Sequence, residues 1–321
     1  MILARLTTGA PVAVIRLRSM GDTVLTTPAL SLLKAWRPDL RVFVVLERPW
    51  DRLLAGNPDV AGVILRDGKG GVWRTIGEIR RLRPQLCLNL HGGSTSAWLT
   101  AFSGARWKAG FGHFAYQAAY NLRIPRAQQI LGRPPQAPVH TAEHLAAAMF
   151  HLGVEAGEIP RARLFADPPP RRRPYAVLHA GAAFHTKQWP AERFAELAGW
   201  LRDTQDLEPV ILAGPGELSL GEMMTLIRGA EVFVGNDSGP AHVAAAFGVP
   251  CVVIFGSSNS RVWSPWRTRC QVVETAWDCK PCPGDRCYAF ERPHCILSVE
   301  TEAVRQAVRG VLAGQPSFQH D

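Results

Sequence analysis

A carboxylate and several polar groups follow a short apolar segment near the N-terminus. Residues Val12–Leu17 are expected to form a strand, and Arg18, Ser19, Gly21 and Asp22 come directly after it. Ligands of doubly wound sheets bind beyond the ends of the strands, and a glycine permits a tight turn there. Asp22 then stands at the start of a helix, where it suits either a catalytic carboxylate or a helix cap. The residue types alone leave both interpretations open.

A second group of reactive side chains follows the strand expected over Tyr175–His179. Thr186 and Lys187 lie in a glycine-containing loop that ends at Pro190, where a helix is expected to begin. A hydroxyl and an ammonium group beside a helix N-terminus suit a diphosphate. Lys187 is equally compatible with a solvated surface lysine, so its position in the sequence does not assign its role.

A strand-to-helix turn at residues 234–242 has the composition of an anion-binding site. Gly239 lets a phosphate approach the backbone, Ser238 offers a hydroxyl, and the following helix adds a partial positive charge. Asp237 precedes these residues, and His242 lies in the first helical turn, within reach of the same ligand. The alternative interpretation is a well-capped helix that contains a buried histidine.

Four of the seven cysteines fall within a short segment near the C-terminus. Cys279, Cys282, Cys287 and Cys295 have a spacing that suits a small structural zinc or iron site, and free thiols or disulfides are the alternatives. The other cysteines lie mostly in apolar segments, as small core residues do. This distribution is unlike that of a secreted disulfide scaffold, so we expect a cytoplasmic protein.

The elements that must position these groups alternate between strands and helices along both halves of the chain. Such alternation predicts parallel, doubly wound sheets. A proline-rich and arginine-rich segment at residues 167–174 cannot form a helix or a central strand, so it suits a linker. We therefore expect an α/β protein with an N-terminal Rossmann-like domain at 1–166 and a C-terminal one at 175–321. The last helix is able to pack back on the N-terminal domain.

This outline fits a GT-B fold, in which two Rossmann-like doubly wound domains face a central cleft. It also fits a periplasmic-type binding protein or a two-domain dehydrogenase. No G-x-G-x-x-G sequence follows a strand and no Walker A sequence is present, which weakens the dehydrogenase and nucleotide-triphosphatase interpretations.

The composition is that of a globular protein with a surplus of positive charge. The 321 residues carry a net charge of +9, with 47% hydrophobic and 20% charged residues. This surplus favours anionic partners such as nucleotide phosphates or a membrane surface, whereas no nucleic-acid-reading motif is present. No apolar run approaches the roughly 18 residues of a membrane span, and we expect no secretory signal. Of the scattered tryptophans such as Trp50, Trp73, Trp107 and Trp263, most are expected in the core or in cleft walls. A few are able to stack on sugar or lipid, and the sequence does not tell which.

The motifs together resemble glycosyltransferase family 9, the bacterial lipopolysaccharide heptosyltransferases. The resemblance spans nearly the whole chain, and its most specific parts are the first Gly-Asp pair and the turn at 235–242. The matching segments are Ser19-x-Gly21-Asp22 with Pro28-Ala29-Leu30, Asn57-Pro58-Asp59-Val60, Ser103-Gly104-Ala105-Arg106 with Gly110-Phe111, Thr186-Lys187-Gln188-Trp189-Pro190 and Gly235-Asn236-Asp237-Ser238-Gly239-Pro240-Ala241-His242.

The resemblance implies a role for each candidate residue. Asp22 matches the family's catalytic base, and the acceptor side comprises Arg16, Arg18, Ser19 and Gly21. The residues that match the donor-binding side are Thr186, Lys187, Glu217, Asp237, Ser238, Gly239 and His242.

The family further implies inverting transfer of a heptose from ADP-heptose to a lipopolysaccharide core or a related anionic, lipid-linked acceptor. One base is sufficient for that reaction, because a nucleotide diphosphate leaves without protonation. No D-x-D motif is present, so catalysis is expected to need no metal or other cofactor. Two alternatives stay open: a different nucleotide-sugar donor, and a nucleotide-sugar-binding protein with impaired catalysis. The expected location is the cytoplasm, with peripheral contact at the inner face of the inner membrane.

One segment departs from the family pattern. After Glu217 the family usually continues through a helix and a short strand, whereas Leu218-Ser219-Leu220 follows here at once. About 20 residues are therefore expected to be absent beside the donor-binding residues, which leaves the setting of Glu217 open.

Overall fold

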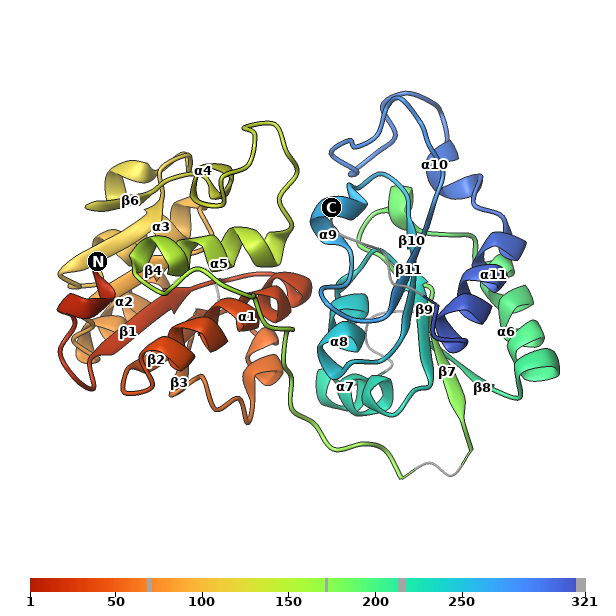
Figure 1. Ribbon diagram of the computed structural model, residues 1–321, viewed down its shortest axis with the longest axis horizontal. Coiled ribbons are helices and arrows are strands. Elements are labelled where there is room, and N and C mark those ends of the chain that lie inside the picture. The colour runs from red at the N-terminus through yellow and green to blue at the C-terminus, as the bar shows by residue number, and fades with distance from the viewer. Residues whose placement is uncertain (68–70, 171–172, 213–217, 316–321) are drawn as a thin grey trace. The chain divides into compact units, whose positions relative to one another are not determined.

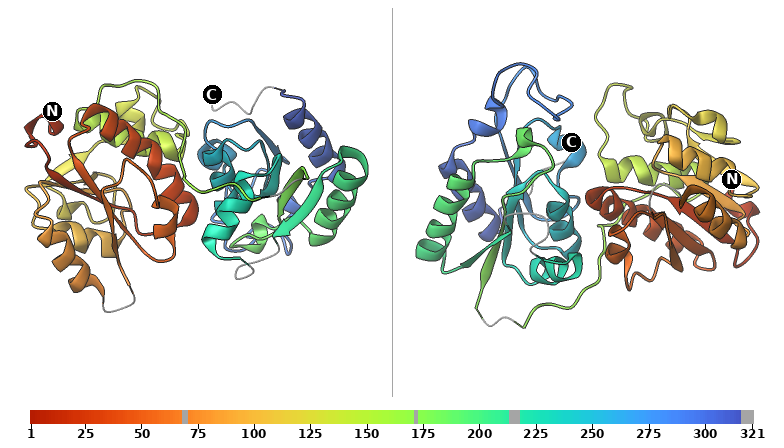
Figure 2. Two further views of the ribbon diagram at one scale, coloured as in Figure 1. Left: turned by 90° about the horizontal axis from the view of Figure 1, so that it is seen from below. Right: turned by 180° about the vertical axis from the view of Figure 1, so that it is seen from behind.

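The computed structural model describes residues 1–67, 71–170, 173–212 and 218–315 of the chain. Contacts divide the chain into two compact units, Met1–Phe165 and Ala166–Asp321. Each unit is a parallel sheet that lies between helices (Figures 1 and 2). No helix of the described residues is long and apolar enough to cross a membrane.

The first unit has a six-stranded sheet in the order β3-β2-β1-β4-β5-β6, and all its strand pairs are parallel. The order reverses direction between β1 and β4, which is where loops on the two sides diverge and leave room for a ligand. The strands are β1 (Pro11–Ile15), β2 (Arg41–Leu46), β3 (Gly62–Leu65), β4 (Leu86–Asn89), β5 (Trp107–Phe111) and β6 (Leu122–Ile124).

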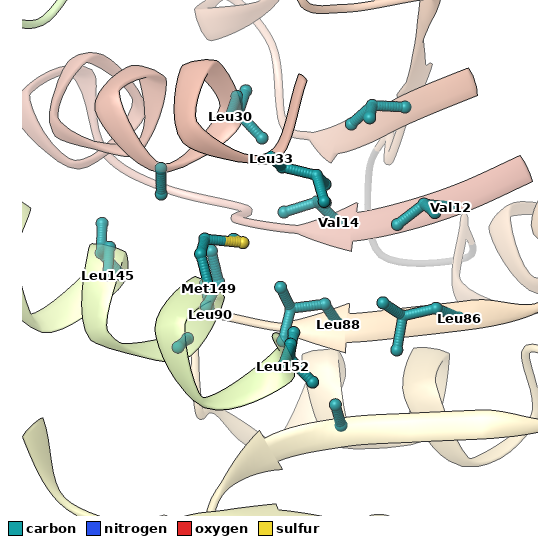
Figure 3. Close-up of a cluster of buried hydrophobic side chains, with 14 of the residues drawn as sticks. Val12, Val14, Leu30, Leu33, Leu86, Leu88, Leu90, Leu145, Met149 and Leu152 are labelled. Atoms are coloured by element: carbon teal, nitrogen blue, oxygen red, sulfur yellow. The ribbon is translucent and has the colours of Figure 1, made fainter. Parts of the chain in front are cut away.

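Alternating apolar residues on β1 bury both faces of this sheet. Val12 and Val14 face the helices α1 and α5 (Figure 3), whereas Ala13 and Ile15 belong to a second cluster with residues of α2 and α3. The α-helices are α1 (Met20–Trp36), α2 (Gly71–Arg81), α3 (Ser94–Ala101), α4 (Ala127–Ile130) and α5 (Thr141–Leu152), and the 3₁₀ turns are η1 (Leu3–Arg5), η2 (Trp50–Leu54) and η3 (Gln117–Ala119).

The second unit has a five-stranded parallel sheet in the order β11-β10-β9-β7-β8. Its direction reverses between β7 and β9, so this unit also has one point at which neighbouring loops diverge. The strands are β7 (Tyr175–His179), β8 (Glu208–Leu212), β9 (Val232–Asn236), β10 (Cys251–Phe255) and β11 (Cys270–Glu274).

Helices cover this sheet as well. Apolar residues of α6 and α11 form one core cluster with β7, β9 and β10, and α8 contacts β9 and β10. The last described helix, α11, packs on β10, β11 and α6 of its own unit. The helical segments are η4 (His185–Lys187), α6 (Ala191–Gln205), α7 (Leu220–Arg228), α8 (Gly239–Phe247), α9 (Ser260–Trp263), α10 (His294–Leu297) and α11 (Thr301–Leu312).

Candidate active site

Asp22 lies in the first turn of α1, beyond the end of β1. Ser19 is the N-cap of this helix and Asp22 is its third residue, so Asp22 is not itself the N-cap. Its Oδ2 accepts hydrogen bonds from the Ser19 N–H (3.0 Å) and the Ser19 hydroxyl (3.2 Å), which satisfies a helix-end donor. Its side chain stays 22% exposed. Capping and catalysis are therefore compatible roles for this carboxylate.

Arg16 fixes the other oxygen of this carboxylate. One guanidinium nitrogen donates to Asp22 Oδ1 and the other terminal nitrogen donates to the Leu90 carbonyl, at the end of β4. The Arg16 Nε is buried and has no partner among the described residues. Arg16 thus ties the two strands at the reversal point and compensates the charge of Asp22.

The remaining candidate acceptor residues differ in accessibility. Gly21 is buried in the first turn of α1, so it contributes backbone only. The Arg18 side chain is 69% exposed, and its Nε lies 4.0 Å from Glu47 Oε2. Of the two arginines, Arg18 is the one whose charge is open to an incoming anion.

Two histidines that the sequence analysis missed lie near Arg16. Burial and the charge of Arg16 lower the pKa of His91, which is the second residue after β4. Burial, with His113 and Arg16, lowers the pKa of His144 to about 4. His91 could have been found, because it follows a predicted strand and precedes two glycines. His144 lies within α5, where nothing in the sequence distinguishes it.

Lys187 and Asp237 meet beyond the ends of β7 and β9. The ammonium nitrogen of Lys187 lies 2.8 Å from Asp237 Oδ2, which also accepts a hydrogen bond from the Ser258 hydroxyl. Asp237 is buried, whereas Lys187 keeps 22% of its side chain exposed. Asp237 therefore orients the lysine. Ser258 was missed, although it follows the apolar strand at 251–255 and so has the same strand-end position.

The N-terminus of α8 lies at the same edge. Ser238 is its N-cap, but the Ser238 side chain does not bond the helix N–H groups: its hydroxyl donates to the Asn236 carbonyl and lies 3.1 Å from His179 Nδ1. Gly239 is half-buried at the helix start, and His242 is buried within the first turn. This arrangement leaves the Ser238 side chain out of the way of an anion at the helix end.

Asn236 holds the two diverging loops together. Its side-chain oxygen accepts from the Trp189 N–H at 3.0 Å, and its side-chain nitrogen donates to the Ala180 carbonyl at 2.8 Å. Asn236 is fully buried. The amide thus links the end of β9 to the loop that carries Lys187.

The Thr186 side chain is buried and hydrogen-bonded to two other segments of the second unit. It is 1% exposed, and its hydroxyl donates to the Gly284 carbonyl and lies 3.1 Å from the Ser257 hydroxyl. The Cys282 N–H also donates to the Ser257 carbonyl at 3.0 Å. In this structure the Thr186 side chain therefore anchors the cysteine-containing segment at 279–287.

A comparison with protein families assigns this chain. The family model described as "Glycosyltransferase family 9 (heptosyltransferase)" matches residues 72–217 and 201–290. The chain belongs to glycosyltransferase family 9. It is therefore a glycosyltransferase, and the resemblance expected from the sequence motifs is confirmed.

Relatives of this family-9 glycosyltransferase are similar over most of their length. Lipopolysaccharide heptosyltransferase 1 of Pseudomonas aeruginosa is 27% identical over 312 residues, which cover 86% of this chain and 87% of the relative. A family-9 glycosyltransferase structure from Veillonella parvula has a TM-score of 0.79 at 20% identity and covers 98% of this chain and 99% of its own. The structure of E. coli ADP-heptose lipopolysaccharide heptosyltransferase II has a TM-score of 0.79 at 19% identity. It covers 95% of this chain and 99% of its own. The GT-B fold class, with two Rossmann-like domains, is confirmed.

The cysteines of this glycosyltransferase do not form a ligand set in the part of the chain that the structure describes. Cys295 is buried, and Cys279, Cys282 and Cys287 are half-buried. No group of three or more His, Cys, Asp or Glu side chains among those residues is arranged to hold a metal. The structure therefore gives no support to the zinc or iron site that the spacing suggested.

The candidate donor residue Glu217 lies outside the described residues. On its C-terminal side, Ser219 caps α7, which leads directly to β9. On its N-terminal side, β8 is the edge strand of the sheet.

Proposed function

We propose that this glycosyltransferase moves a heptose from ADP-heptose to a lipopolysaccharide core or a related anionic, lipid-linked acceptor, with inversion at the anomeric carbon. The names of its relatives support this choice, since both the Pseudomonas aeruginosa and the E. coli proteins are lipopolysaccharide heptosyltransferases. The observation that carries the proposal is the Lys187 ammonium, held by Asp237 beside the N-terminus of α8.

This edge of the second unit suits a nucleotide diphosphate. An ammonium group and a helix N-terminus both favour negative charge, and they lie beyond the strand ends at the reversal point. Lys187 and the helix N–H groups would offset the charge that develops on ADP as the bond to the sugar breaks. Gly239 would allow the phosphate to approach the backbone.

Asp22 is the proposed general base. The acceptor hydroxyl oxygen forms a bond to the anomeric carbon while the bond from that carbon to the diphosphate oxygen breaks, and the hydroxyl proton passes to Asp22. ADP leaves with the electron pair of the broken bond. Arg16 and Ser19 hold the carboxylate in one orientation, and the exposed Arg18 would face an anionic group of the acceptor.

No step of this proposal requires a divalent cation, because Lys187 and the α8 N-terminus take the charge-compensating role. We expect turnover to be unchanged when EDTA is added to enzyme purified without metal. Activity that disappears with EDTA and returns with Mg²⁺ would contradict the proposed mechanism.

The decisive experiment separates donor recognition from transfer. ADP is titrated into the protein by calorimetry, and ADP release is then measured from ADP-heptose with and without a lipopolysaccharide-core acceptor. We expect ADP binding, and acceptor-dependent release that exceeds release from ADP-glucose. ADP binding without heptose transfer favours another donor or an impaired enzyme, and absent nucleotide binding contradicts the proposal.

The impaired-enzyme alternative has one observation in its favour, the short junction between Glu217 and Leu218. The family has about 20 further residues at this position, so the short junction would remodel the donor side. Acceptor-dependent ADP release would exclude this alternative.

A further inference from the structure

Three aromatic side chains of the first unit gather on its surface. Trp73 of α2, Trp98 of α3 and Phe102, which follows α3, are 67%, 53% and 41% exposed. The Trp98 and Phe102 rings stack with centroids 5.2 Å apart, and Trp73 lies 5.8 Å from Phe102 and 6.4 Å from Trp98. We call these three residues the aromatic patch. The sequence left open which tryptophans lie outside the core, and the structure shows that Trp73 is one of them.

The aromatic patch is not needed to bury the sheet. The inward sides of the two helices are already apolar, since Ile76 and Ile79 of α2 and Leu99 of α3 belong to the buried cluster beneath them. The two helices contact each other, so their outward rings are brought together. Contiguous exposed aromatic surface of this kind usually marks an interaction site.

Arginines border the aromatic patch. Arg80 and Arg81 are exposed and follow Trp73 by seven and eight residues, which places them on the same side of α2. The Arg80 stem lies against Gly104, two residues after Phe102, because a Cβ at Gly104 would be 3.5 Å from the Arg80 Cγ.

On the C-terminal side of Glu78, which pairs with Arg74 on α2, a long stretch of the sequence has no acidic residue. From residue 79 to residue 142 there is no Asp or Glu, so this stretch carries +8 of the total net charge of +9. It contains β4, α3, β5, η3, β6 and α4 of the first unit. Its basic residues are Arg80, Arg81, Arg83, Arg106, Lys108, Arg123, Arg126 and Arg133.

We propose that the aromatic patch and its bordering arginines dock this enzyme on an anionic lipid bilayer. Tryptophan and phenylalanine rings favour the boundary between headgroups and acyl chains, and arginines favour the anionic headgroups. The charge of residues 79–142 complements such a surface. The inference deepens the proposed function. It rests on that function in one respect only, that the acceptor is linked to a lipid.

Vesicle binding tests this inference with the full chain and without donor or acceptor. The probes are vesicles of phosphatidylcholine alone and of phosphatidylcholine mixed with phosphatidylglycerol. We expect the protein to sediment with the mixed vesicles, and the double variant Trp73→Ser, Trp98→Ser to bind at least about tenfold more weakly. The control Trp36→Ser removes another exposed tryptophan, 45% accessible, and should bind like the unchanged protein.

A charge variant gives an independent measurement. Arg80→Ser should weaken binding to the mixed vesicles roughly fivefold, whereas Arg202→Ser, an exposed arginine of α6, should have no effect. Brominated phosphatidylcholine in the mixed vesicles should quench tryptophan fluorescence of the unchanged protein and quench less in the double variant. Circular dichroism of each variant establishes that it is folded.

Three results would overturn the inference: no preference for the mixed vesicles, full binding by the double variant, or an equal loss in Trp36→Ser. Quenching of the patch tryptophans by a soluble anionic oligosaccharide, with no vesicle binding, would also overturn it in favour of a saccharide site. Because these measurements use neither donor nor turnover, an enzyme that failed to transfer heptose would still give a clear answer about the surface.

Discussion

At the scale of single residues, the Asp22 carboxylate has both a structural and a proposed catalytic role. We expect Asp22→Asn to reduce turnover by about 10²- to 10⁴-fold, the usual contribution of a general base, and to leave ADP binding unchanged. The measurement is acceptor-dependent ADP release beside calorimetric ADP titration. Retained turnover would rule out Asp22 as the base.

The second unit offers a matched control for this variant. Glu222 is the third residue of α7 and accepts from the N–H of its N-cap, Ser219, at 2.7 Å, as Asp22 does from Ser19. Glu222→Gln should lower the free energy of unfolding about as little as Asp22→Asn does, by about 1 kcal/mol or less. Unlike Asp22→Asn, it should cause no loss of turnover.

Lys187 provides the corresponding test on the donor side. Lys187→Ala removes the proposed charge partner of the diphosphate, so we expect the Kd for ADP to rise about 10- to 100-fold. Lys34→Ala is the control, because the Lys34 ammonium is likewise anchored, to the Pro38 and Leu40 carbonyls, in the other unit. An unchanged Kd in Lys187→Ala would show that the lysine serves only the fold.

Strand-end reasoning locates candidate residues well but does not give their partners. It placed Asp22 and Lys187 beyond parallel strands, where the structure has them. It could not show that Thr186 points toward Gly284, because that contact joins residues 98 positions apart through a hydroxyl whose direction depends on packing.

At the scale of elements, Gly256 at the end of β10 allows the loop that carries Lys187 to approach closely. A Cβ at this position would lie 2.2 Å from the Thr186 carbonyl oxygen. Gly256→Ala should therefore lower the free energy of unfolding by about 1–3 kcal/mol and weaken ADP binding. Urea unfolding and ADP titration measure the two effects.

A glycine in open surroundings is the control. Gly199 lies within α6 and a Cβ there would meet nothing within 4 Å. Gly199→Ala should raise the free energy of unfolding by about 0.5–1 kcal/mol, because alanine favours a helix. Equal destabilisation by both variants would contradict the close approach at Gly256.

The strands that the sequence did not reveal are mostly short or at sheet edges. β6 has three residues and β11 mixes polar and apolar residues, and both lie at the edge of a sheet. β5 is an inner strand, but Lys108 and Gly110 interrupt its apolar residues. Central strands such as β1 and β10 are buried on both faces and therefore read as continuous apolar runs.

At the scale of the whole molecule, the two units differ in strand order, but each is a parallel sheet whose strand order reverses once. Two strands lie beyond β1 on one side of the first sheet, whereas only β8 lies beyond β7 in the second. The alternation of elements predicted parallel sheets in both units. It could not give the strand order, because the order depends on which side of the sheet each connection crosses.

Each unit contains a half-buried imidazole that should make stability depend on pH. Burial lowers the pKa of His144, in the first unit, and of His179, in the second, from 6.5 to about 4. Both are neutral when folded, whereas the unfolded chain binds protons below about pH 6.5. Stability is therefore full above that pH and falls as the pH decreases toward 4, by about 2 kcal/mol for each group at pH 5.

Urea unfolding at pH 7.5 and pH 5.0 measures this dependence. His144→Leu should reduce the difference between the two pH values, whereas substitution of the exposed His185 should not. A pH difference that is the same in His144→Leu as in the unchanged protein would contradict the prediction.

The concentration of charge in one stretch has a consequence for how the molecule moves. Residues 79–142 carry +8, so all the other residues together carry only +1. A chain with this asymmetry experiences a torque as well as an attraction in the field of an anionic surface. It would arrive already turned toward that surface, and the time spent in unproductive orientations would fall before any side chain made contact.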